Sequence, residues 1–198
     1  MSNEAYKYIY NQNLMSAKAS VHYENTFRAD RAKEQAALVP ARVQDIIEYT
    51  NKFLKMLGMT CIDNPRIENP IEELKKPDFY ERIQKDYALE CIHDIVWMSF
   101  TTCGFLGVVA LGADINFDMP PSKDNYNDKA ENQKDWKYTT SGIIVHTLNK
   151  KWDESFVLVF PLCKNEKNDY SRGDIECGIG NYLIDMGVPI LDYYSHKF

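Results

Sequence analysis

The chain has 198 residues, of which 44% are hydrophobic, 26% charged and 13% aromatic, and its formal net charge is −6 at pH 7. This composition excludes a disordered, collagen-like or coiled-coil protein, and the length predicts a single globular domain over residues 1–198. Because no segment concentrates lysine and arginine, the sequence gives no strong nucleic-acid signal.

Three helices are predicted in the first part of the chain, over about 3–20, 25–38 and 40–57. In the first and third, apolar side chains recur at steps of three and four residues, whereas the second is alanine-rich and ends before Pro40. The third is the clearest, since Pro40 suits a first helical turn and Gly58 suits a C-terminal cap. Its apolar stripe comprises Val43, Ile46, Ile47, Thr50, Leu54 and Leu57. Of these, Val43, Ile47, Leu54 and Leu57 are predicted to be buried, and Gln44, Asp45, Glu48 and Lys55 are predicted to be exposed.

The stretch 60–77 contains three prolines and is predicted to be an extended connector with at most one helical turn. It is also the best candidate for an internal boundary. A fourth helix is expected over 78–101, while 103–113 fits either a helix or a strand. Residues 95–113 are uncharged and long enough to cross a membrane, but their acidic flanks and polar content favour a buried core element.

Residues 118–137 are polar and proline-containing, which predicts a long surface loop. The β-rich runs of 139–163 predict an antiparallel hairpin with both faces covered, with Pro161 at a strand end or edge. A helix over 174–186, capped by Ser171 and ended by Gly187, and a strand over 188–195 complete the chain. Helices followed by late strands predict an α+β fold with a small, mainly antiparallel sheet.

The cysteines are five in number and show no paired spacing. With no secretory signal in the first residues, this indicates reduced thiols and a cytoplasmic location. No cofactor and no metal site are predicted. The loop containing Asp124 and Asp128 lacks the glycine and glutamate of a calcium-binding loop, and Gly178-Ile179-Gly180 lacks the preceding strand of a dinucleotide site, so helix packing is expected there.

Catalytic candidates are few. His146 and His196 could meet at one end of the sheet with neighbouring acids, and Cys91 or Cys103 could act as a nucleophile. Cys91 and His93 would point about 200° apart on a helix and so cannot pair with each other. These residues support an alternative in which the protein is a small hydrolase or transferase.

The expected function is non-catalytic binding of a macromolecular partner, most simply a protein, by an inhibitor, immunity-type or adaptor protein. Aromatic side chains in polar surroundings are typical anchors of such interfaces. The candidates for partner binding are Trp136, Trp152, Tyr126, Tyr193 and Tyr194. No membrane partner is expected.

Overall fold

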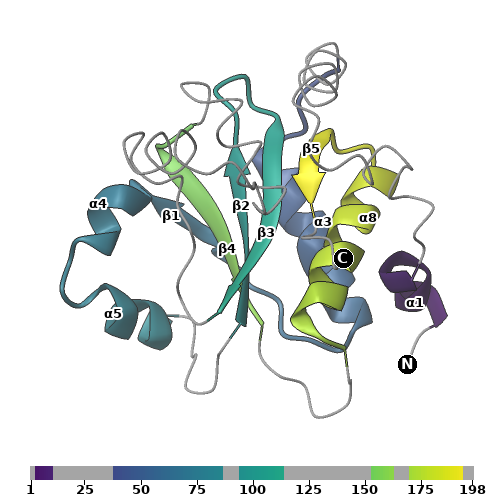
Figure 1. The fold of residues 1–198 in the computed structure, drawn as a ribbon, viewed down its shortest axis with the longest axis horizontal. Coiled ribbons are helices and arrows are strands. Elements are labelled where there is room, and N and C mark those ends of the chain that lie inside the picture. The colour runs from purple at the N-terminus through teal and green to yellow at the C-terminus, as the bar shows by residue number, and fades with distance from the viewer. Residues whose placement is uncertain (1–2, 11–37, 87–93, 114–152, 163–169, 194–198) are drawn as a thin grey trace, which may run out of the picture.

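The computed structural model describes residues 3–10, 38–86, 94–113, 153–162 and 170–193 (Figure 1). Its helices are α1 (Asn3–Tyr10), α3 (Val43–Met56), α4 (Pro70–Leu74), α5 (Phe79–Asp86) and α8 (Arg172–Asp185). Its strands are β1 (Arg66–Glu68), β2 (Asp94–Phe100), β3 (Leu106–Ala113), β4 (Phe156–Pro161) and β5 (Ile190–Tyr193).

The strands form one sheet in the order β1-β4-β2-β3-β5. All neighbouring pairs are antiparallel except β3 and β5, which run parallel. Helices packed on a mainly antiparallel sheet confirm the predicted α+β class. In Figure 1, α4 and α5 lie beside β1, and α8 and α1 lie toward the other edge of the sheet.

The sequence predicted one helix over 78–101, and this is wrong for the last part of that range. Helix α5 occupies the first part, residues 87–93 lie outside the described residues, and Asp94–Phe100 forms β2. The error has a physical cause, because β2 is buried on both faces and its near-continuous apolar run lacks the alternation that marks a half-exposed strand. The ambiguous segment 103–113 resolves as a turn followed by β3.

Residues 95–113 do not form the membrane-spanning helix that the sequence disfavoured. These residues make two antiparallel strands whose register pairs Ile95 with Gly112 and Met98 with Val109. The connecting turn includes Gly104 at φ +82°, a conformation that glycine adopts without strain. Within the described ranges, no helix is long and apolar enough to cross a membrane.

The late strands were predicted only in part. β4 and β5 lie within the expected ranges 139–163 and 188–195, and Pro161 is the last residue of β4. The first strand of the predicted hairpin lies outside the described residues. The neighbours of β4 in the described sheet are β2 and β1, which the sequence predicted as a helix and a connector.

The helix predictions agree with the structure more closely than the strand predictions do. α1 and α3 fall within the expected 3–20 and 40–57, whereas 11–20 and 25–37 lie outside the described residues. α8 begins at a capping box in which the Ser171 hydroxyl accepts from the backbone N–H of Asp174, and Gly187 follows it at φ +80°. Both features match the sequence prediction.

The stripe of α3 is confirmed with small departures. Ile46, Ile47, Thr50, Leu54 and Leu57 are buried, while Val43 is only partly buried. Asp45, expected to be exposed, is partly covered because the Arg42 guanidinium lies 2.6 Å from its Oδ1 atom.

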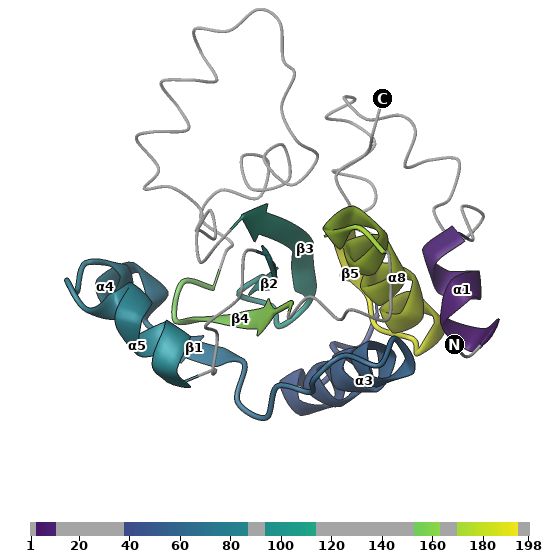
Figure 2. The ribbon, with the colours of Figure 1, turned by 90° about the horizontal axis from the view of Figure 1, so that it is seen from below.

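Helix α8 lies between the sheet and α1, and α3 also packs against it (Figure 2). A Cβ atom at Gly178 would stand 2.3 Å from Cζ of Phe53, so this position needs glycine for the approach of α3. The Asn181 amide donates to the Tyr8 carbonyl oxygen at 2.6 Å, which ties α1 to the same helix. Gly178 thus serves helix packing, as expected for this position.

We predict that Leu54→Ala lowers the free energy of unfolding by about 2 to 5 kcal/mol, because the Leu54 side chain is fully buried in the core that α3 shares with α8. The neighbouring exposed variant Lys55→Ala should stay within about 0.5 kcal/mol of the parent. Urea denaturation measures both. Equal stability of the two variants would contradict the docking of α3.

Candidate functional site

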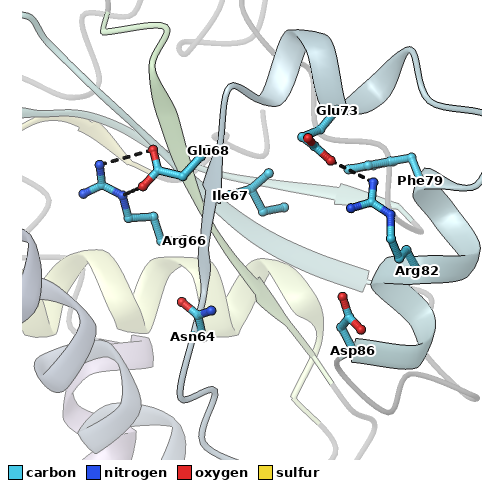
Figure 3. A pocket seen from close by; sticks show the side chains of 8 residues that line it. All are labelled: Asn64, Arg66, Ile67, Glu68, Glu73, Phe79, Arg82 and Asp86. Carbon is cyan, nitrogen blue, oxygen red and sulfur yellow. Dashed lines mark hydrogen bonds and ion pairs between the residues drawn. The ribbon is translucent and has the colours of Figure 1, made fainter.

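A cleft of about 510 Å³ lies between β1, α4 and α5 (Figure 3). We call it the charged cleft. Its lining residues are Asn64, Arg66, Ile67, Glu68, Glu73, Phe79, Arg82 and Asp86. The volume lies in the range of ordinary ligand sites, but most of the lining side chains are polar.

Local backbone features fix β1 at the mouth of this cleft. The Val159 N–H donates to the Pro65 carbonyl oxygen at 2.8 Å, and the Asn69 N–H donates to the Ser155 carbonyl oxygen at 2.7 Å. Asn69 then adopts a left-handed conformation (φ 47°), and Pro70 opens α4. The two hydrogen bonds hold both ends of the strand against β4.

This pairing determines which N–H and C=O groups of β1 form no hydrogen bond with β4. In an antiparallel ladder, alternate residues direct their N–H and C=O groups to the same neighbour. Pro65 and Asn69 bond to β4, and so the groups of Ile67, opposite Val157, point the same way. The backbone groups of Arg66 and Glu68 therefore point away from the sheet, where the described sheet has no further strand.

The side chains of β1 also divide between two sides. Ile67 is buried and points toward α5 and Phe79 in Figure 3. Arg66 and Glu68 are exposed on the other face, where Arg66 Nε lies 2.5 Å from Glu68 Oε1. The Arg66 guanidinium also stacks 3.9 Å from the centroid of the Phe156 ring, which orients it.

The α5 side of the cleft carries a second charge pair. Arg82 donates to Glu73 Oε2 at 2.7 Å, and Lys76 bonds the other carboxylate oxygen. The bond from Lys76, followed by that from Arg82, lowers the pKa of Glu73, and Glu73 in turn raises the pKa of Arg82. Both groups are therefore ionised at neutral pH.

Asp86 is the remaining charge of the cleft. It is exposed, and it has no hydrogen bond or ion pair with another described residue. Two arginines against three carboxylates leave the lining with a formal charge of −1. The cleft can thus accept a cation at Asp86 while its other charges remain paired.

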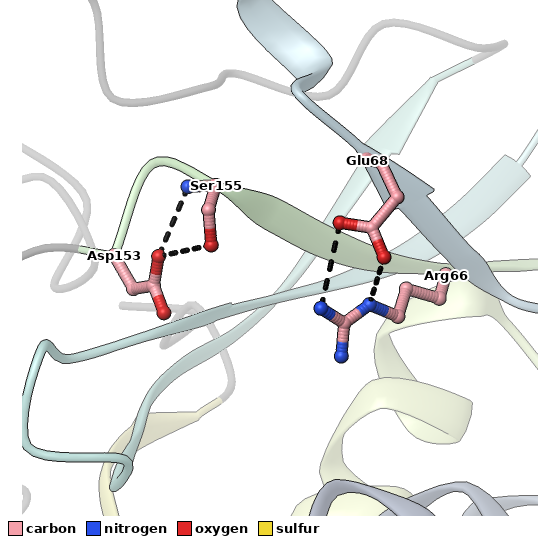
Figure 4. A network of polar contacts seen from close by, with 4 residues as sticks. All are labelled: Arg66, Glu68, Asp153 and Ser155. Atoms are coloured by element: carbon pink, nitrogen blue, oxygen red, sulfur yellow. Dashed lines mark hydrogen bonds and ion pairs between the residues drawn. The ribbon is translucent and has the colours of Figure 1, made fainter.

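A short polar network lies next to the cleft, where β4 begins (Figure 4). Asp153 Oδ1 accepts from the Ser155 backbone N–H at 3.0 Å and from its hydroxyl at 2.5 Å. This carboxylate, one of the acids that the histidine hypothesis could have used, is engaged in a local turn. The turn also presents the Ser155 carbonyl that holds Asn69.

Most residues predicted to form a site lie outside the described residues. These are His146, His196, Cys91, Trp136, Trp152, Tyr126 and Tyr194. Cys103 is exposed in the turn between β2 and β3, and Tyr193 ends β5. Neither lines the charged cleft.

The charged cleft was missed by sequence reasoning. Its residues fall in the proline-containing connector and in the first turns after it, which were not considered for function. One signal was available: arginine and glutamate flank an isoleucine in Arg66-Ile67-Glu68, the alternation of a short strand. Three residues are too few for that pattern to separate a strand from a connector.

Among the cysteines that the structure describes, Cys177 is buried, whereas Cys61 and Cys103 are exposed. Burial, reinforced by the carboxylates of Glu176 and Asp174, raises the pKa of the Cys177 thiol to about 12, which keeps it protonated and unreactive. No group of three metal-binding side chains is assembled among the residues that the structure describes.

No protein-family model, curated protein or solved structure matches this chain.

We predict that iodoacetamide labels Cys61 and Cys103 in the folded protein, since both thiols are exposed, and labels Cys177 only after unfolding. Peptide mass spectrometry before and after addition of denaturant measures the difference, and all five cysteines should react in denaturant. Labelling of Cys177 at the rate of Cys61 in the native protein would contradict the burial of α8.

Proposed function

We propose that this protein is a non-catalytic binding protein that engages a segment of a partner protein, and that the charged cleft takes part in the contact. The observation that carries the proposal is the outer edge of β1, which pairs with no other strand of the described sheet and lies at a cleft of mixed charge. Exposed strand edges and clefts beside them are a recurrent means of holding extended peptide segments.

Two further features support binding over chemistry at this place. The charges at Arg66, Glu68, Glu73 and Arg82 are mutually paired, which suits recognition and positioning better than proton transfer. The lining also combines a small apolar base, Ile67 and Phe79, with a polar rim, the usual layout of a protein-binding surface. The hydrolase or transferase alternative rests on His146, His196 and Cys91, outside the described residues, and stays a prediction.

The proposal is tested by selecting binders from a displayed library of random dodecapeptides, with counter-selection on the urea-unfolded chain. An enriched peptide is then titrated into ¹⁵N-labelled protein. We expect the largest amide shifts at Arg66, Glu68, Arg82 and Asp86, because these residues surround the cleft.

Two outcomes would contradict this expectation. Failure to enrich any peptide for the folded chain would contradict the binding function. Peptides whose binding is lost in Trp136→Ala or Trp152→Ala, and which leave the cleft amides unshifted, would keep the binding function and assign it to the tryptophan surface instead.

A further inference from the structure

We propose that the charged cleft receives an extended peptide segment of a partner protein as an added strand on the outer edge of β1, with a lysine or arginine side chain placed at Asp86. The inference rests on the proposed function and specifies its chemistry. It concerns how the segment is held and which residue it must carry.

The outer backbone groups of β1 are arranged to pair with an incoming strand. Arg66 and Glu68 each direct an N–H and a C=O group away from β4, so an incoming strand finds two donors and two acceptors at the spacing of a β-ladder. The residues are also exposed, which leaves the edge accessible. At about 3.3 Å per residue, the three residues of β1 match a segment of roughly 10 Å, or three to four residues.

The walls of the cleft supply the side-chain preference. A strand added to β1 directs alternate side chains toward the α5 side, where Ile67 and Phe79 form the base and Asp86 stands at the rim. Arg82 is already held by Glu73 at 2.7 Å and needs no anion from a ligand. Asp86 makes no hydrogen bond or ion pair among the described residues and acts on Arg82 only as a more distant charge. Because the lining is also negative by one charge, a basic side chain is the complementary one.

The same features limit what else can bind. β1 is very short and carries charged side chains on its exposed face. Both features disfavour non-specific pairing with other strands. A segment must therefore gain from its side chains as well as from its main chain. If a second copy of this chain paired through β1 instead, the protein would form a dimer, which the experiment below detects.

The probe is a capped heptapeptide with one central lysine flanked by valine, threonine and serine, together with variants N-methylated at one amide each. We expect the parent peptide to shift the amides of Arg66 and Glu68, and N-methylation to weaken binding about tenfold or more at every second position only. This alternation follows because only alternate residues of an added strand bond to β1.

The charge preference is tested with a matched pair of variants on α5. Asp86→Lys should weaken binding of the lysine peptide about fivefold, and replacing the peptide lysine by glutamate should restore affinity to this variant. Glu81→Lys makes the same charge change at an exposed residue that does not line the cleft, and it should change affinity by less than about twofold.

The outcomes separate the inference from the proposed function. Binding at the cleft with N-methylation effects that do not alternate overturns strand addition and leaves the proposed function standing. Equal effects of Asp86→Lys and Glu81→Lys overturn the basic-residue preference. A concentration-dependent dimer that Arg66→Glu abolishes identifies a second copy as the occupant and overturns the inference. Absence of any peptide binding, here and in the library selection, overturns the proposed function as well.

Discussion

Burial of β2 and β4 on both faces is the constraint from which the arrangement of the described residues follows. Val157, Leu158 and Val159 are consecutive and none is exposed, so neither face of the sheet can be left to solvent. One face carries Val96, Met98, Phe100, Leu158 and Phe160, which share a core with α3 and α8. The other carries Ile95, Trp97, Val157 and Val159, all buried, and its edge at Ile67 is where α5 lies.

Helices α1, α3 and α8 pack against one another to form the layer that covers one face of this sheet. Phe53 of α3 reaches Gly178 of α8, and the Tyr8 hydroxyl donates to Asp185 at 2.7 Å while its carbonyl accepts from Asn181. Side chains from three helices thus meet along α8, whose residues from Ile175 to Leu183 are buried. This layer covers one face of the sheet, whereas β1 is the edge strand of the described sheet and directs the backbone groups of Arg66 and Glu68 away from β4.

The sequence was informative where a periodic pattern was long and bordered by turn residues. The stripe of α3 was predicted because a 14-residue helix repeats its apolar spacing several times. The start of α8 was predicted because the Ser171–Asp174 capping box is a motif of four neighbouring residues. β2 was mistaken for helix because a strand buried on both faces has no alternation, and its apolar residues happened to continue the four-residue spacing of α5.

The charged cleft could not be predicted for a different reason. Its parts come from β1, α4 and α5, and what makes β1 an edge strand is its pairing with β4, about ninety residues later in the chain. No residue near Arg66 or Glu68 in the sequence indicates that β4 is the neighbouring strand. Asp86 likewise looks like any solvated helix residue until the fold places it beside the strand.

Amide hydrogen exchange of β1 in the free protein tests the central claim, an open strand edge at the cleft, most directly. The account predicts that the Ile67 amide, directed toward Val157, exchanges at least about a hundredfold more slowly than the amides of Arg66 and Glu68, which point away from the sheet. Equal protection of all three amides would show that the outer edge is already paired, and would contradict the account.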